Sequence, residues 1–160
     1  MHPRKLYTQL CECKDARERA IAALGFMRDA SLADQGFLLL WRGGELMLVA
    51  SSNGDEMPGK IMAKARELWD RESDTQPESD LTATIESSSI ALTPAIPRWH
   101  GERGECYEPR FLGIYRDSSW VPVGMAVLRV DPGGSLQPLR RAYFDAICNA
   151  FIDSNDMRVS

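Results

Sequence analysis

The chain has 160 residues, of which 44% are hydrophobic and 26% are charged, so extended disorder is excluded and there is enough apolar material for one core. Nineteen basic against 23 acidic side chains give a formal net charge of −4, which lacks the basic excess typical of nucleic-acid binders. No apolar run approaches the roughly 18 residues that a membrane-spanning helix needs.

The first five residues contain Arg4 and Lys5 and give the chain a basic start, but a mixed polar stretch follows where a signal peptide would carry its apolar segment. We therefore expect a cytoplasmic protein that binds neither nucleic acid nor membrane. A single domain is predicted over residues 1–160, with its core at about 6–152. The four cysteines are expected to be free thiols rather than a disulfide framework.

The first predicted element is an amphipathic helix over residues 6–24. Apolar residues recur there every three or four positions, at Leu6, Leu10, Cys13, Ala16, Ala20 and Leu24. Gly25 is expected to end this helix. Residues 26–32 are then expected to form a short helical turn or linker that leads into a sheet.

The clearest local signal is a β-hairpin over residues 36–52. Two apolar runs, 37–41 and 46–50, flank Gly43 and Gly44. A Gly-Gly pair suits a type I′ turn because both of its central residues need positive φ. Neither run alternates strictly between apolar and polar residues, which predicts a sheet covered on both faces.

A helix is predicted to follow Pro58, which suits a first helical turn, and to end near Arg71. Its apolar face would consist of Ile61, Met62, Ala65, Leu68 and Trp69. Beyond it we expect a polar surface loop over 72–80, a strand over 81–86, and an irregular connection over 87–109 with one more short strand around 90–92.

A second hairpin is predicted from residues 111–115 and 120–130, ending at 131–134. Ser135 is expected to cap a final helix, with Pro138 near its first turn. The polar tail from residue 153 onward is expected to fray. The apolar stripe of this helix would comprise Leu139, Tyr143, Ala146, Ile147, Ala150 and Phe151.

This order of elements predicts an α+β fold with a central, mostly antiparallel sheet of five or six strands. The N- and C-terminal helices are expected to lie on one face, and the middle helix with the long loop on the other. The first helix has two alternatives: it packs within its own chain, or it joins a homodimer through Ala16, Ala20 and Ala23.

Four segments in this order resemble a GAF domain, a small-molecule-sensing and dimerising module of bacterial signalling proteins. They are the leading helix running into Gly36–Trp41, the turn and strand 43–52, the segment Val121–Leu128, which is similar to the family's penultimate strand, and the closing helix. Together they cover about residues 6–152. The short middle helix and the polar loop look most like GAF domains attached to serine/threonine kinases.

The resemblance implies a non-enzymatic regulatory domain that binds a small molecule or a protein partner and signals through its terminal helices. The alternative is a degenerate scaffold that acts only in dimerisation or protein interaction. The sequence lacks the Asn-Lys-x-Phe signature of cyclic-nucleotide-binding members, and Tyr107 follows Cys106 where bilin-binding members carry a Cys-His pair. The cysteines of the methionine sulfoxide reductase members are not evident either, so the cofactor stays unknown.

Residues 99–110 concentrate chemically versatile side chains, and in a GAF-like fold this part of the chain often forms the lid of the ligand pocket. Arginine offers a planar fork for a carboxylate or phosphate, and an aromatic ring stacks on a ligand ring. The alternative is an irregular surface loop that its aromatic residues pin to the sheet. The candidate ligand-binding residues are Trp99, His100, Arg103, Cys106, Tyr107 and Arg110.

Catalysis is disfavoured, because the chain has only two histidines and no nucleophile elbow or phosphate-cradling glycine loop. The one enzymatic hypothesis pairs Cys106 as nucleophile with His100 as base, as in a thiol-dependent reductase. The potential donors at His100, Glu102, Glu105 and Cys106 match no zinc-ligand spacing, so we expect no metal.

Overall fold

The computed structural model describes residues 1–72, 84–85 and 98–157. The helices in these residues are α1 (Pro3–Cys11), α2 (Ala16–Ser31), α3 (Gly59–Glu72) and α4 (Arg141–Asp153), and η1 (Ser52–Gly54) is a 3₁₀ turn. The main sheet contains β1 (Gln35–Arg42), β2 (Glu45–Ser51), β4 (Trp99–His100), β5 (Cys106–Arg116) and β6 (Ser119–Val130). The strands β3 (Thr84–Ile85) and β7 (Leu139–Arg140) form a separate parallel pair.

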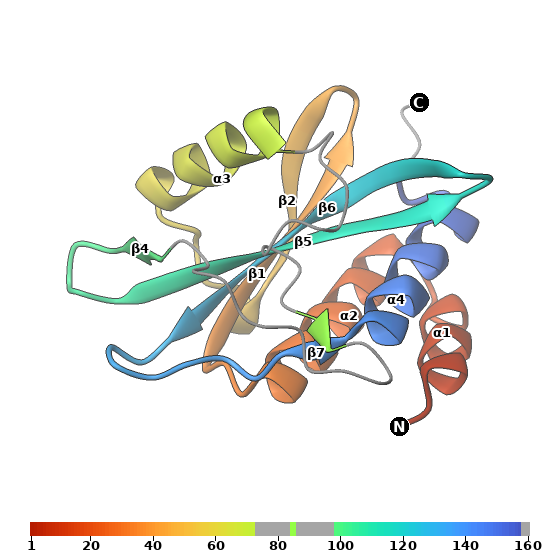
Figure 1. Ribbon diagram of the computed structural model, residues 1–160, viewed down its shortest axis with the longest axis horizontal. Helices are drawn as coiled ribbons and strands as arrows, with labels where there is room; N and C mark the ends of the chain where they lie inside the picture. The colour runs from red at the N-terminus through yellow and green to blue at the C-terminus, as the bar shows by residue number, and fades with distance from the viewer. Residues whose placement is uncertain (73–83, 86–97, 158–160) are drawn as a thin grey trace.

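The α+β class and the antiparallel sheet are confirmed. The five strands of the main sheet lie in the order β2-β1-β6-β5-β4, and each neighbouring pair is antiparallel. Figure 1 shows this sheet as a strongly twisted layer, with α1, α2 and α4 on one side and α3 on the other. The expected distribution of helices over the two faces is therefore confirmed.

Both predicted hairpins are present. Gly43 and Gly44 have φ of 64° and 75°, as the turn between β1 and β2 requires. A β-bulge interrupts this pair, because Leu38 lies opposite Ala50 and Leu39 opposite Leu48, which leaves Val49 without a partner on β1. The second hairpin, β5 and β6, begins earlier than predicted and pairs from Cys106 opposite Val130 to Arg116 opposite Ser119.

The prediction of one helix over residues 6–24 is wrong, because the chain breaks between α1 and α2. Asp15 is extended, and its side chain accepts a hydrogen bond from the backbone N–H of Glu18 at 2.8 Å, which caps α2. Gly25 does not end the helix: α2 continues to Ser31, so most of the expected linker is helical. Burial of the flanking Leu24 and Met27 outweighs the cost of about 1 kcal/mol for an interior glycine.

The middle helix is confirmed as α3, but the final helix begins later than predicted. Ser135 does not cap α4, whose N-cap is Arg140, because Leu139 and Arg140 pair with β3 instead. The strand expected at 81–86 is present at Thr84–Ile85. The predictions for 73–80, for the rest of 81–86 and for a strand at 90–92 lie outside the described residues.

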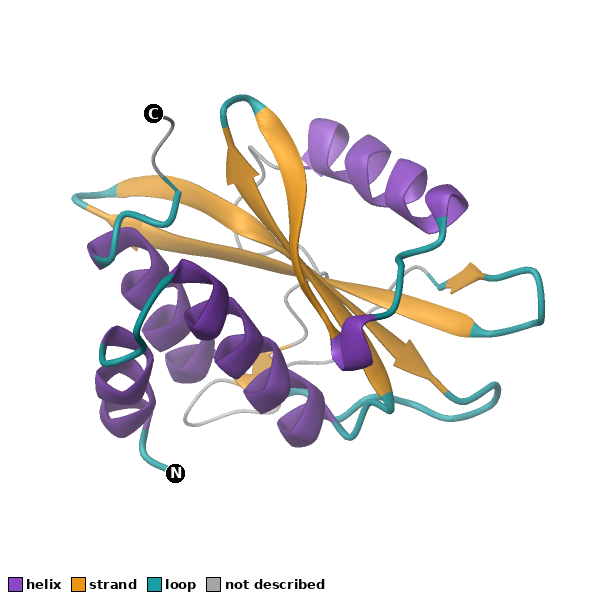
Figure 2. Cartoon of the chain, turned by 180° about the vertical axis from the view of Figure 1, so that it is seen from behind, coloured by secondary structure: helices purple, strands orange, loops and turns teal. Residues whose placement is uncertain are grey.

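The core has two layers, one on each face of the sheet. On the first face, α1, α2 and α4 bury side chains such as Leu10, Leu24 and Phe151 against β1, β5 and β6. Figure 2 shows the helices of this layer from behind. Ala20 and Ala23 are buried in it, so these two members of the predicted dimer contact are covered within one chain.

The prediction that the tail frays from residue 153 onward is wrong for residues 153–157. Asp156 is buried, and both of its carboxylate oxygens accept hydrogen bonds from Arg19 Nη1 at 3.1 Å. Arg19 Nε also donates to the Leu10 carbonyl at 3.0 Å, and Arg42 Nε donates to the Asp156 carbonyl at 2.6 Å. The tail is therefore held against the ends of α1, α2 and β1.

Candidate functional site

The six predicted ligand-binding residues do not lie on one irregular loop. Trp99 and His100 form β4, whereas Cys106, Tyr107 and Arg110 belong to β5. Only Arg103 lies in the turn between these strands. The prediction of an irregular connection is wrong for residues 99–100 and 106–109, because β5 pairs with β6 and β4 pairs with β5, which extends the sheet through them.

Strand alternation also sends these side chains to opposite faces. Trp99 and Tyr107 lie opposite each other in the register and belong to the core beneath α3. His100 and Cys106 form the next pair, and Cys106 belongs to the core on the other face. The six residues thus do not converge on one pocket.

The face beneath α3, where the lid was expected to cover a ligand, is filled by aromatic side chains. The rings of Trp69 and Phe111 stack with centroids 5.4 Å apart and an interplanar angle of 3°. The ring of Trp41 also packs against Trp69, with centroids 5.4 Å apart and an interplanar angle of 31°. Phe37 and Tyr107 pack 6.3 Å apart, and burial raises the pKa of the Tyr107 phenol.

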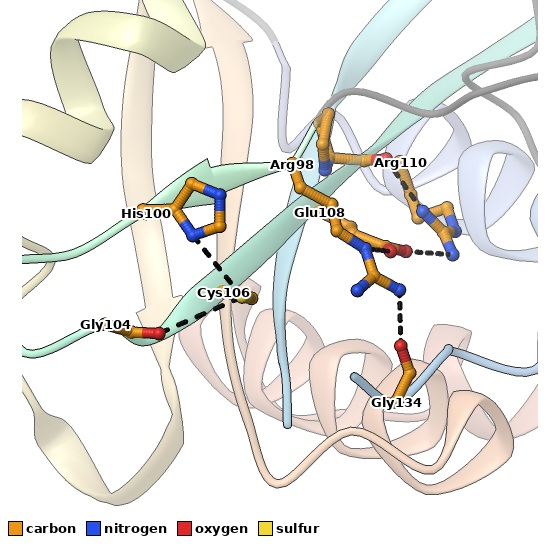
Figure 3. A network of polar contacts seen from close by, with 8 residues as sticks. Arg98, His100, Gly104, Cys106, Glu108, Arg110 and Gly134 are labelled. Carbon is orange, nitrogen blue, oxygen red and sulfur yellow. Dashed lines mark hydrogen bonds and ion pairs between the residues drawn. The ribbon is translucent and has the colours of Figure 1, made fainter. Parts of the chain in front are cut away.

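The helix-facing side of β5 carries a polar network that the sequence analysis did not identify (Figure 3). Glu108 is buried, and its two oxygens accept hydrogen bonds from Arg98 Nε at 2.6 Å and from Arg110 Nη2 at 3.1 Å. Arg98 Nη2 also donates to the Gly134 carbonyl. Burial lowers the pKa of Arg110, while the charge of Glu108 opposes that shift.

Arg110 therefore has a structural explanation. It is buried within β5 and donates to the Pro109 carbonyl at 3.0 Å. It also shares the Glu108 carboxylate with Arg98. The network joins β5 to the segment around Gly134. The sequence does show a carboxylate and a guanidinium two residues apart, at Glu108 and Arg110. That spacing places them on one face of a strand, but it does not reveal that the two side chains are buried.

Cys106 and His100 form the second polar contact in Figure 3. Cys106 Sγ lies 3.5 Å from His100 Nδ1 and 3.9 Å from the Gly104 carbonyl oxygen. The cysteine is only 4% exposed, however, so a substrate cannot reach its sulfur without movement of the chain. In the described residues, no group of three or more His, Cys, Asp or Glu side chains is placed to hold a metal ion.

Arg103 lines a groove on the surface of the described residues. The groove has a volume of about 420 Å³ and lies between the first turn of α3 and the β4–β5 turn. Backbone hydrogen bonds lower the pKa of Glu105 on its wall. Arg129, also on the wall, donates to both carboxylate oxygens of Asp34 at 3.0 and 3.1 Å, and this pairing raises its pKa. The lining residues are Pro58, Gly59, Lys60, Ile61, Gly101, Glu102, Arg103, Glu105 and Arg129.

Neither a protein-family model nor a curated protein matches this chain. None of the helices that the structure describes has the length and apolar character of a membrane-spanning segment.

Proposed function

We propose that the chain is a cytoplasmic, non-enzymatic regulatory domain with a GAF-like fold, and that it works by binding another protein chain. Its output would be the position of the terminal helices α1 and α4. The element order, the antiparallel sheet and the placement of three helices on one face and one on the other support the GAF-like architecture.

The filled face beneath α3 carries this proposal. Ligand pockets usually enclose about 300–1,000 Å³ and bury most of the ligand. Here Trp69, Phe111 and Tyr107 are buried between α3 and the sheet, and they occupy the space that an enclosed ligand would need. This favours the interaction module among the alternatives that the sequence left open.

The surroundings of Cys106 and Glu108 support a non-enzymatic role. The thiol of Cys106 is buried next to His100, and the carboxylate of Glu108 is neutralised by two guanidinium groups. An active nucleophile or acid–base group needs access to its substrate and a pKa matched to its task. Neither group has that access among the described residues.

A second candidate function rests on the open groove at Arg103. Three cationic side chains, Lys60, Arg103 and Arg129, line it beside the first turn of α3. Helix N-termini and guanidinium groups both favour anions. The groove also carries the carboxylates of Glu102 and Glu105, and Arg129 is paired with Asp34, so a ligand with an anionic group would bind near Lys60 and Arg103.

A thermal-shift screen separates the two candidates. The full chain is heated with nucleotides, amino acids and tetrapyrroles at millimolar concentration, and we expect no shift in Tm above about 1 °C. The matched variants are Arg103→Ala, in the groove, and Lys5→Ala, on α1. A ligand that raises the Tm of the wild type and of Lys5→Ala, but not of Arg103→Ala, would establish the small-molecule function instead.

Binding of protein is tested directly by a photo-crosslinking amino acid placed at exposed positions around the domain in cells that make the protein. We expect adducts with protein from one contiguous surface and none from the remaining positions. Adducts spread evenly over all positions, or absent from all of them, would contradict an interaction module.

A further inference from the structure

The turn that follows β2 carries an Asn-Gly pair, Asn53 and Gly54, inside η1. Both residues are exposed. Asn53 has a left-handed backbone, with φ of 59° and ψ of 16°, and Gly54 has φ of 71°. Among the described residues, no group forms a hydrogen bond with the side-chain amide of Asn53, so this amide can change its rotamer without breaking a contact.

The residues on either side of this pair are anchored to β1. Ser52 is buried, and its hydroxyl oxygen accepts a hydrogen bond from the backbone N–H of Gly36 at 2.9 Å. On the other side, the side-chain amide of Gln35 donates to the carboxylate of Asp55. The backbone N–H of Asp55 donates to the Ser52 carbonyl at 3.2 Å, which is long for such a bond. The exposed pair can therefore rotate while both ends of the turn stay attached to the sheet.

We propose that Asn53 is a site of spontaneous covalent modification, at which the side chain loses ammonia and becomes a carboxylate. The backbone nitrogen of Gly54 gives up its proton to hydroxide and forms a bond to Cγ of Asn53. The bond from Cγ to Nδ2 breaks, and ammonia leaves after taking a proton from water. One water molecule then opens the five-membered imide. Cleavage of the imide bond to Cγ yields aspartate, whereas cleavage of the bond to the main-chain carbonyl carbon yields isoaspartate.

Gly54 supplies the conditions that this attack needs. It has no Cβ to crowd its nitrogen, and no atom lies within 4 Å of the position that a Cβ would take, so the space beside it is open. The attack also requires rotation about the Cα–C bond of Asn53, away from its ψ of 16°. The wide conformational range of glycine permits the chain to follow that rotation.

The two other asparagines of the chain lack this combination. Asn149 lies inside α4, and its side-chain oxygen accepts hydrogen bonds from Arg116 at 2.8 and 3.2 Å. Asn155 is exposed and left-handed, with φ of 61°. However, the backbone N–H that follows it, that of Asp156, donates to the Phe151 carbonyl at 3.0 Å. The nitrogen that would attack Asn155 is therefore held in place.

The modification changes the charge of a groove of about 560 Å³ between α2 and β2. Asn53 and Gly54 line this groove, and among its described lining residues only Arg17 is charged. A carboxylate at position 53 offsets that positive charge. Isoaspartate also adds one carbon to the main chain of η1. The groove thus changes from cationic to neutral with time, without an enzyme.

Incubation of the folded full chain at neutral and at mildly alkaline pH, followed by peptide mapping with mass spectrometry, tests the proposal. We expect a gain of about 1 Da in the peptide that contains Asn53, divided between aspartate and isoaspartate. The peptides that contain Asn149 and Asn155 should change at least about tenfold more slowly. The rate at Asn53 should rise with pH, because the Gly54 nitrogen attacks after losing its proton. Asn53→Asp supplies the standard for the aspartate product.

Gly54→Ala tests the role of the attacking residue. The added Cβ crowds the nitrogen, so we expect the rate at Asn53 to fall about tenfold. The matched control is Gly133→Ala, because Gly133 also has a positive φ, of 84°, and open space around it, but lies far along the chain. This control should leave the rate at Asn53 unchanged. Tm values measured for both variants show that each remains folded.

Four results would overturn the proposal: no product at Asn53, equal rates at Asn53 and Asn155, an unchanged rate in folded Gly54→Ala, or a product that forms only in the chain unfolded by urea. The last result would show that η1 protects the pair in the folded protein.

Discussion

At the scale of single residues, Glu108 is a buried carboxylate that is held by two guanidinium groups. Its carboxylate lies between the guanidinium groups of Arg98 and Arg110, and both it and Arg110 are buried. A buried ion pair adds little compared with a well-packed apolar pair, but removing one partner leaves an uncompensated buried charge. Glu108 is therefore needed because Arg110 is there.

Glu108→Gln should lower the free energy of unfolding by about 3 kcal/mol, measured by urea denaturation, because Arg110 then keeps its buried charge without a carboxylate. The matched control is Glu45→Gln, which removes a carboxylate paired with Arg66 at the surface and should cost less than about 1 kcal/mol. Equal losses in the two variants would show that the burial of the network does not determine its energetics.

At the scale of elements, α3 is held on the sheet by aromatic packing. Trp69 from the helix stacks on Phe111 from β5, and Trp41 from β1 lies against it. Trp69→Ala should cost about 3–5 kcal/mol, because the neighbouring side chains relax only partly into the space left by the indole. Denaturation of the variant and the wild type measures the loss.

An apolar cavity in a folded protein accepts a small apolar ligand of matching size. Indole should therefore raise the Tm of Trp69→Ala and leave that of the wild type unchanged. Arg66→Ala, at a half-exposed position of the same helix, is the control and should show no indole response. An indole response of the wild type would mean that the face beneath α3 is not filled.

Local signals predicted most of these elements. The Gly43–Gly44 turn, the apolar stripe of α3 and the strands around residues 111 and 125 were identified because each signal is contained in a few neighbouring residues. The break before Ala16 was missed because the apolar spacing of α1 continues through it, although Asp15 is a residue type that favours an N-cap. The start of α4 was missed because β7 depends on a distant strand, β3.

The candidate site was harder to predict than the fold. The grouping of residues 99–110 by chemical type assumed a loop, in which neighbouring side chains converge. Pairing of β5 with β6 makes them alternate instead, which separates Tyr107 from Cys106 and Arg110. The network around Glu108 depends on Arg98, which also donates to the carbonyl of Gly134 in a later part of the chain, and no short pattern records that contact.

At the scale of the whole molecule, polar contacts tie the two ends of the described chain together. Tyr7 on α1 donates to Asp153 at 2.7 Å, and Arg116 donates to the same carboxylate at 2.7 Å. These bonds lower the pKa of Asp153, with the bond from Arg116 contributing most. Asp156 shows the opposite shift, since burial raises its pKa despite the attraction of Arg19.

The two carboxylates should therefore respond to acid in opposite directions. Asp153 stabilises the fold above its unfolded pKa of about 3.9, and that contribution is lost as the pH falls toward its lower folded pKa. In Asp153→Asn, the loss of stability between pH 7 and pH 3 should be smaller than in the wild type. Urea midpoints at the two pH values measure it.

Asp156→Asn provides the comparison with the opposite sign. Because the folded pKa of Asp156 is raised, its protonation favours the folded state as the pH falls. Removing that group should make the loss of stability in acid larger. The same acid response in both variants would contradict opposite pKa shifts at these two positions.

The contact between Arg19 and Asp156 also limits where the molecule can be shortened. Composition and periodicity place the end of the core near residue 152, and a boundary drawn there discards an apparently dispensable tail. Such a cut leaves Arg19 of α2 buried without the carboxylate of Asp156. It also removes the Asp156 carbonyl, which accepts the hydrogen bond from Arg42. For fusion or truncation, the usable boundary lies after residue 156.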